Sequence, residues 1–245
     1  MDVKNSVKEN EQVMIAKKIA IITGASGNMG QAVVKKFLAE GYQVIGTIIP
    51  NDPVSVDIDD VNFERVIVDL MNEEDSETFI ESIIAKYGSI AAVICTVGGF
   101  AMSNIAKTTT SDIAKQYKLN FETAYNIARP AFIHMLQNEN GRIFLVGSMP
   151  GINAAGSKGM VAYGLAKSLI FRLAELMNDE AKGLNVVTNV IVPSTIDTPQ
   201  NRASMPDADF NSWVKPTAIA ETIFFYCTDK AAALREPVIK LYNNA

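Results

Sequence analysis

The sequence predicts an α/β fold with a doubly wound parallel sheet of about seven strands and helices on both faces. Short apolar runs alternate with longer segments whose apolar residues recur at helical spacing, as in chains that wind β and α units in turn. The apolar runs are continuous, which is typical of strands buried on both faces of a parallel sheet. No linker rich in Pro, Gly or Ser divides the chain, so we expect one domain over residues 15–245.

Each element follows from its local pattern, taken in chain order. The predicted strands are Ile19–Thr23, Gln43–Ile49, Val66–Val68, Ala91–Val97, Ile143–Val146, Val186–Val192 and Val238–Tyr242. The predicted helices are Met29–Glu40, one containing Phe79–Ile84, one beginning near Ser111 and containing Asn120, and one from about Val161 to Met177. In the first helix Met29, Val33 and Phe37 form one apolar face, and Gly41 follows it as a C-terminal glycine.

Composition excludes several classes of protein. The 245 residues are 48% hydrophobic and 20% charged, with a net charge of −5. The acidic balance disfavours non-specific nucleic-acid binding, and no apolar run is long enough to predict a membrane span. One histidine and two distant cysteines predict no metal site. Residues 1–14 are polar and lack the apolar segment of a signal peptide, so we expect a flexible tail on a cytoplasmic protein.

A glycine-rich loop joins the first predicted strand to the first helix. Residues Thr23–Gly30 read TGASGNMG. Glycines let the backbone approach a pyrophosphate closely, and the helix N-terminus presents unpaired N–H groups to the anion. At a strand–helix junction this pattern predicts a dinucleotide-binding, Rossmann-like fold.

Tyr163 and Lys167 stand four residues apart on a predicted helix, so their side chains share one face. A nearby cation favours the phenolate and lowers the pKa of a tyrosine. Such a tyrosine can transfer a proton near neutral pH. Ser148 ends the fifth predicted strand, and Asn120 lies on the helix that begins near Ser111.

The TGxxGxxG loop, followed in order by Asn120, Ser148, Tyr163 and Lys167, resembles the short-chain dehydrogenase/reductase family. The resemblance implies that Tyr163 is the acid/base and that Lys167 lowers its pKa and binds the nicotinamide ribose. Ser148 would polarise the substrate carbonyl or imine, and Asn120 would carry a water linked to Lys167. Two departures stand out. Asn28 replaces the usual middle glycine, and the loop between Ser148 and Tyr163 is longer than usual, a difference that loops absorb at low cost.

The same resemblance implies the remainder of the cofactor site. The implied contacts are Gly24, Ser26, Gly27, Asn28, Met29, Gly30, Asp69, Leu70, Val97, Gly98, Gly99, Tyr163, Lys167, Pro193, Thr195, Ile196 and Thr198. In the family an acid after the second strand binds the ribose of NAD and repels the 2′-phosphate of NADP. That position falls at Ile48, and no acid follows before Asp52. The cofactor is therefore NADP or NAD, and the missing acid favours NADP.

The segments Gly159–Lys167 and Asp197–Trp213 resemble dihydropteridine reductases in particular. That resemblance implies reduction of a quinonoid dihydropterin, whereas the intact Ser148 favours ordinary carbonyl or alcohol chemistry. A non-catalytic NAD(P)-binding sensor is a third reading. We expect residues 194–215 to form a substrate loop, with Met205, Phe210 and Trp213 covering an apolar substrate or packing on a neighbour. The family resemblance also implies a homodimer or homotetramer.

Overall fold

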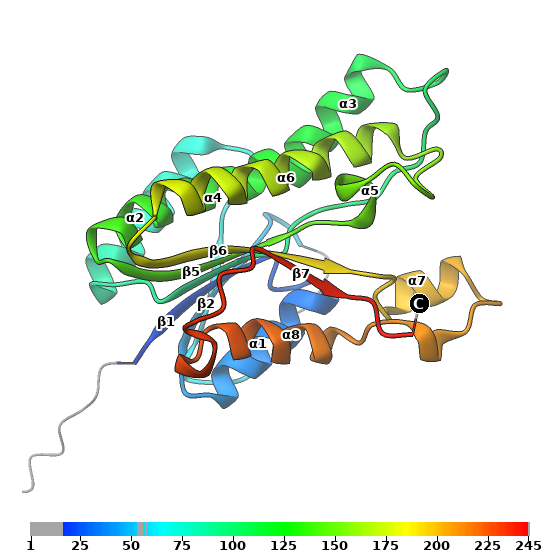
Figure 1. Cartoon of the computed structure of the whole chain (residues 1–245). Helices are drawn as coiled ribbons and strands as arrows, with labels where there is room; N and C mark the ends of the chain where they lie inside the picture. Colours follow the sequence, from blue (N-terminus) through cyan, green and yellow to red (C-terminus); the bar gives the residue numbers. More distant parts are fainter. Residues whose placement is uncertain (1–16, 53–55, 57, 245) are drawn as a thin grey trace, which may run out of the picture.

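The computed structural model describes residues 17–52, 56 and 58–244. Within them, seven parallel strands form one sheet in the order β3-β2-β1-β4-β5-β6-β7 (Figure 1). The strands are β1 (Ile19–Thr23), β2 (Gln43–Ile48), β3 (Phe63–Ile67), β4 (Ala92–Cys95), β5 (Asn140–Val146), β6 (Asn185–Pro193) and β7 (Val238–Leu241). The predicted sheet is confirmed. The tail expected over residues 1–14 lies outside the described residues.

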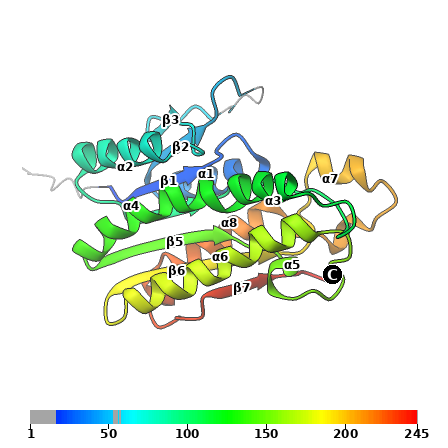
Figure 2. The ribbon, with the colours of Figure 1, turned by 90° about the horizontal axis from the view of Figure 1, so that it is seen from above.

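Helices cover both faces of the sheet, as the doubly wound prediction requires. One face carries α2 (Glu73–Tyr87), α4 (Thr123–Gln137) and α6 (Val161–Glu180), and the other carries α1 (Asn28–Ala39) and α8 (Pro216–Tyr226). Seen from above, α4 and α6 lie side by side along the sheet (Figure 2). Every residue of β1 and of β4 is buried, because these central strands are covered on both sides.

The boundaries of some strands differ from the predicted ones, both at the edge of the sheet and in its centre. The strand β3 begins three residues earlier than expected, and its residues Glu64 and Val66 are only partly buried while Arg65 and Ile67 are exposed. An edge strand has one unpaired side, so it lacks the continuous apolar run by which the central strands were recognised. The fourth strand is shorter than expected and ends at Cys95, which leaves Val97 in the loop that follows.

The helix expected from about Ser111 is divided into three consecutive pieces. They are α3 (Thr110–Tyr117), the π-helical turn η1 (Lys118–Glu122) and α4. Thr109 caps α3 through a reciprocal contact with Asp112. The sequence pattern did not predict the π turn, which widens the helix at Asn120 and is a feature often found at functional sites.

The carboxyl ends of the parallel strands meet at one edge, where the shorter elements gather (Figure 1). These are α5 (Met149–Ile152), α7 (Pro199–Ser204) and the 3₁₀ turn η2 (Phe210–Ser212); a further 3₁₀ turn, η3 (Asp229–Ala231), follows α8. Ligands of open α/β sheets bind at this edge. Among the described residues no helix is both long and apolar enough to cross a bilayer.

Candidate active site

The glycine loop after β1 has the backbone shape that the sequence pattern predicts. Gly24 has a φ of +63°, a conformation that favours glycine. A Cβ on Gly30 would lie 2.1 Å from the carbonyl oxygen of Gly24, so only glycine allows the first turn of α1 to pack against the loop. In the described residues no side chain caps α1 at Gly27. The N–H groups at this helix start therefore fit the pyrophosphate of a dinucleotide.

The loop after β4 is joined to the loop after β1, which brings two predicted cofactor segments together. The Thr96 hydroxyl donates to the Thr23 carbonyl at 2.6 Å, and the Thr96 N–H donates to the Thr23 hydroxyl at 3.1 Å. A Cβ on Gly24 would lie 3.0 Å from a methyl carbon of Val97. Asp69 and Leu70 follow β3. The Asp69 carboxylate accepts the N–H of Met71 at 3.0 Å, and the Leu70 carbonyl accepts the side-chain amide of Asn126 at 3.0 Å.

Asp52 lies against the glycine loop, which sequence spacing did not reveal. The Ser26 hydroxyl donates to the Asp52 carboxylate at 2.5 Å. This contact joins residues 26 positions apart, so no local pattern could have shown it. A carboxylate thus lies beside a predicted cofactor contact, although no acid stands at Ile48. Such a charge repels a 2′-phosphate.

Tyr163 and Lys167 lie one turn apart on α6, with the lysine amine 5.9 Å from the centre of the tyrosine ring. The Lys167 side chain is buried, with a residue exposure of 3%, and its amine donates to the Val146 carbonyl at the end of β5 at 2.7 Å. Burial lowers the pKa of Lys167 to about 8, because the charged form loses hydration.

Burial raises the pKa of the Tyr163 phenol, and the neighbouring Ser148 hydroxyl acts in the opposite direction. With a pKa of about 8, Lys167 is largely charged at neutral pH, so it can still favour the phenolate of Tyr163. The lowering of the Tyr163 pKa expected from the sequence stays a prediction.

Ser148 is buried immediately after β5, and its hydroxyl has no hydrogen-bond partner among the described residues. The Tyr163 phenol is its polar neighbour, and interaction with Ser148 lowers the pKa of that phenol. Helix α5 and the turns after it take up the additional residues between Ser148 and Tyr163. A buried hydroxyl without a partner is costly, and it fits the oxygen or nitrogen of a substrate.

Asn120 lies in the π turn, and both polar atoms of its side chain have protein partners. Its Oδ1 accepts the N–H of Gly99 at 3.1 Å, and its Nδ2 donates to the Gly99 carbonyl at 2.9 Å and to the Gln116 side chain at 2.9 Å. The Oδ1 can accept a second hydrogen bond, so the water expected to join Asn120 to Lys167 stays a prediction. Gln116 was not predicted as a site residue, because nothing in its spacing distinguishes it.

Phe100 is a second residue that the sequence analysis missed. Its ring meets the Tyr163 ring edge-on, with centroids 5.1 Å apart and planes at 82°, a geometry that aromatic pairs favour. The ring is nevertheless exposed. Two backbone hydrogen bonds hold the Phe100 loop beside α6, from Ser103 to Gly159 at 2.7 Å and from Val161 to Ser103 at 3.3 Å.

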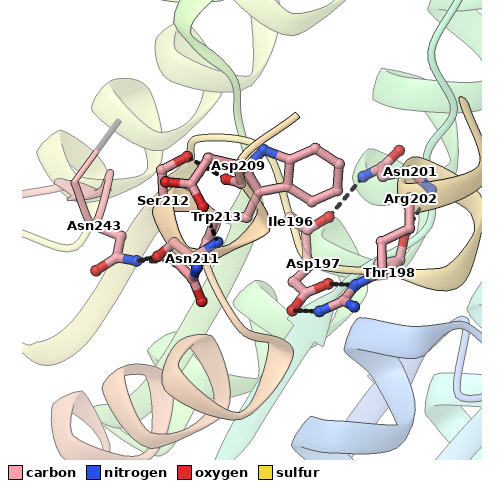
Figure 3. A network of polar contacts seen from close by, with 10 residues as sticks. All are labelled: Ile196, Asp197, Thr198, Asn201, Arg202, Asp209, Asn211, Ser212, Trp213 and Asn243. Carbon is pink, nitrogen blue, oxygen red and sulfur yellow. Dashed lines mark hydrogen bonds and ion pairs between the residues drawn. The ribbon is translucent and has the colours of Figure 1, made fainter. Parts of the chain in front are cut away.

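The predicted substrate loop is an internally bonded unit (Figure 3). Arg202 donates to both carboxylate oxygens of Asp197, at 2.5 and 2.9 Å, and the Asn201 side chain donates to the Ile196 carbonyl at 2.8 Å. Thr198 caps α7 by accepting the N–H of Asn201 at 3.2 Å. Asn243 donates to the carbonyls of Asn211 and Trp213 at 3.0 and 3.1 Å, which ties the end of the chain to the loop.

The side chains expected to cover a substrate differ in their placement. Trp213 is buried and packs beneath the loop, whereas Met205 is exposed. Phe210 contacts the Trp213 ring, with centroids 4.9 Å apart, and the Arg202 guanidinium lies 4.6 Å from the Phe210 centroid. A half-open pocket of about 510 Å³ is formed by the loop together with α8 and the end of the chain; its lining residues are Asp197, Arg202, Phe210, Asn211, Trp213, Val214, Lys215, Ala218, Leu241 and Asn243. None of the four predicted catalytic residues, all within the described part of the chain, belongs to this lining; they are Asn120, Ser148, Tyr163 and Lys167.

Comparison with known proteins agrees with this fold. The family model described as short chain dehydrogenase matches residues 18–209, so the chain belongs to the short-chain dehydrogenase/reductase family. It is an NAD(P)-dependent oxidoreductase, as its relatives are.

Two curated relatives and one solved structure show the range of similarity. The acetoacetyl-CoA reductase of Acinetobacter sp. (strain RA3849) is 25% identical over 79% of this chain and 80% of its own. The dihydropteridine reductase of Dictyostelium discoideum is 28% identical over 86% and 88%. The structure titled "ElxO with NADP Bound" superposes with a TM-score of 0.81 at 21% identity, covering 92% of this chain and 97% of the other. That likeness shows the fold alone.

Proposed function

We propose that this protein transfers a hydride between a nicotinamide and a carbonyl, alcohol or imine-type substrate, with Tyr163 as the acid/base. The observation that carries the proposal is the unpartnered, buried Ser148 hydroxyl beside Tyr163, one helical turn from the buried Lys167. A buried hydroxyl without a partner is costly for folding. In a non-catalytic sensor no substrate would offset that cost, whereas in an enzyme the substrate supplies the missing hydrogen-bond partner.

The residues divide the chemistry between them. A bound reduced nicotinamide supplies a hydride, which carries both electrons to the substrate carbon. Ser148 donates a hydrogen bond to the substrate oxygen or nitrogen and orients it toward Tyr163. The Tyr163 hydroxyl gives its proton to that atom, so the substrate gains two hydrogens in total. Charged Lys167 stabilises the resulting phenolate, which then regains a proton from solvent.

A quinonoid dihydropterin is the second candidate substrate. The Asp197–Trp213 segment resembles dihydropteridine reductases, and the relative from Dictyostelium discoideum bears that name. Phe100 adds a structural reason, because an exposed aromatic ring beside the acid/base is suited to contact a planar conjugated substrate.

The test is the 340 nm absorbance of NADH and NADPH, measured in parallel with quinonoid dihydrobiopterin and with acetoacetyl-CoA as a carbonyl probe. Oxidation in the presence of only one of the two identifies the substrate class. Tyr163→Phe should bind cofactor as the parent does and lose at least 100-fold in kcat, consistent with the contribution of about 10²–10⁴ from general acid catalysis. Undiminished turnover in this variant would show that Tyr163 is not the acid/base.

The cofactor preference depends on Asp52 in this proposal. The absence of an acid at Ile48 favours NADP, but the Asp52 carboxylate on Ser26 is a negative charge beside the glycine loop. We expect NADH to be the better coenzyme and Asp52→Asn to shift kcat/KM toward NADPH by about tenfold, roughly the 1.4 kcal/mol of one modest charge interaction. An unchanged ratio in Asp52→Asn would mean that Asp52 plays no part in the choice.

We further propose that residues 15–245 are one domain that forms a homodimer or homotetramer. The sheet draws its strands from Ile19 to Leu241, which supports a single folding unit. Apolar side chains on α4 and α6 remain exposed; they are Tyr125, Ile133, Leu165, Leu169 and Leu176. Such a face is suited to burial against a second copy.

A further inference from the structure

A pair of buried amides lies behind the cofactor loop that follows β4. Gln116, on α3, is 8% exposed, and Asn120, in η1, is 1% exposed. The Gln116 side-chain oxygen accepts the Asn120 amide at 2.9 Å. The π turn begins between the two residues, at Lys118. A buried polar pair of this kind fixes one arrangement of its surroundings, because any other leaves polar groups unpaired.

Asn120 connects this buried pair to the backbone of the cofactor loop by hydrogen bonds. It contacts both polar groups of Gly99, accepting the N–H at 3.1 Å and donating to the carbonyl at 2.9 Å. The amide can be oriented in two ways, differing by a flip of its oxygen and nitrogen. The N–H and carbonyl of Gly99 set this orientation, and the Gln116 side chain reinforces it by accepting from the same Asn120 nitrogen.

Gly98 joins this amide to the lysine of the site. A Cβ on Gly98 would lie 2.7 Å from Asn120 Oδ1 and 3.3 Å from Lys167 Nζ. Gly98 therefore lies between the two groups without room for a side chain. A shift of the Asn120 amide moves Gly98 and Gly99, and with them the surface that faces Lys167.

We propose that Gln116 is a positioning residue for the cofactor, acting through Asn120 on the Gly98–Gly99 segment. The inference rests on the proposed function, since that segment is taken to contact the cofactor. It assigns Gln116 no contact with the cofactor or the substrate.

The test compares three variants of the full chain. Gln116→Met keeps the length of the side chain and removes the acceptor oxygen, whereas Gln116→Glu keeps an acceptor oxygen in either protonation state. Thr123→Val is the matched control. It removes another side-chain hydrogen bond next to the π turn, from Thr123 at the start of α4 to the Leu119 carbonyl at 2.9 Å, and leaves every partner of Asn120 in place. The measurements are the Kd of NADH by fluorescence titration and the Tm of each protein.

We expect Gln116→Met to raise the Kd about fivefold, the effect of one net hydrogen bond, and Gln116→Glu to restore the parent value within twofold. Thr123→Val should lower the Tm and leave the Kd unchanged. If Gln116→Met does not fold, Gln116→Leu takes its place, since leucine is well tolerated in helices. A parental Kd in the apolar variant, or an equal rise in Thr123→Val, would overturn the inference. Failure of the parent to bind NADH and NADPH would instead refute the proposed function.

Discussion

At the scale of single residues, the site keeps polar groups buried in states that are unfavourable for folding. Ser148 has a hydroxyl without a partner in the described structure, and Lys167 has an amine whose charge is destabilised by burial. Both costs are relieved when a ligand provides partners, because binding then restores the lost interactions. The site residues should therefore show activity and stability moving in opposite directions.

Ser148→Ala tests this opposition at the substrate side. The variant should lose about 10²–10³ in kcat, the usual loss when one donor to a developing charge is removed. Its Tm should equal or exceed that of the parent, because the change removes an unsatisfied buried hydroxyl. Ser82→Ala is the control, since the Ser82 hydroxyl bonds the Phe79 carbonyl far from the site. A clear fall in Tm for Ser148→Ala would contradict the expectation.

Lys167→Met tests the same opposition between activity and stability through the pH dependence of the Tm. The folded protein holds the pKa of Lys167 at about 8, below the ordinary value of 10.5, so between these values the unfolded chain binds more protons and the parent gains stability as pH rises. The penalty is complete below about pH 8 and disappears toward pH 10.5. Lys167→Met should thus melt above the parent at pH 7, with about 3 kcal/mol as the upper order of magnitude. By pH 10 the difference in Tm should have largely vanished; a difference that stays constant across thermal melts at pH 7, 8.5 and 10 would rule this out.

At the scale of elements, the features that depend on neighbouring residues could be predicted from the sequence. The contacts between distant segments could not. The strands, the glycine loop and the Tyr163–Lys167 turn could be recognised because each depends on neighbouring residues. Asp52 on Ser26 and Phe100 on Tyr163 are contacts across the chain, and no spacing rule contains them. The π turn was missed because it inserts into a helix without a change in composition. Trp213 is buried under the loop that it was expected to close, since the loop packs on its own apolar side chains.

The contact between α7 and the first turn of α1 predicts that the substrate loop helps to retain the cofactor. Asn28 donates its side-chain amide to the Gln200 side chain at 2.8 Å, beside the predicted pyrophosphate site. Gln200→Ala should increase the dissociation rate of NADH about three- to fivefold, as expected for the loss of one exposed hydrogen bond. Stopped-flow displacement measures this rate, and Gln137→Ala at the end of α4 serves as the control. Equal dissociation rates in the parent and Gln200→Ala would separate the loop from cofactor retention.

At the scale of the whole molecule, the candidate site lies at the carboxyl edge of the sheet. The helices on one face of that sheet also expose apolar side chains to solvent. The core divides into one cluster under α2, α4 and α6 and another under α1 and α8, so each helix has its inner side occupied. Because their inner sides already face the core, the outer sides of α4 and α6 are expected to be polar. Instead the exposed Tyr117 and Tyr125 lie on either side of Phe121, which packs against the core, with successive ring centroids 5.3 and 5.8 Å apart.

Leu165→Glu tests whether this outer face joins two copies. Leu165 lies on α6 and is 50% exposed, so a charge there costs little in a monomer but is strongly unfavourable inside an apolar interface. We expect the parent to sediment as a dimer or tetramer and Leu165→Glu to dissociate to a smaller species at micromolar concentration. Val61→Glu, at a position that is 97% exposed before β3, should leave the parent's assembly intact. Because Tyr163 and Lys167 lie on the same helix as Leu165, dissociation should also lower turnover, whereas a parent that sediments as a monomer would show that the face has no role in self-association.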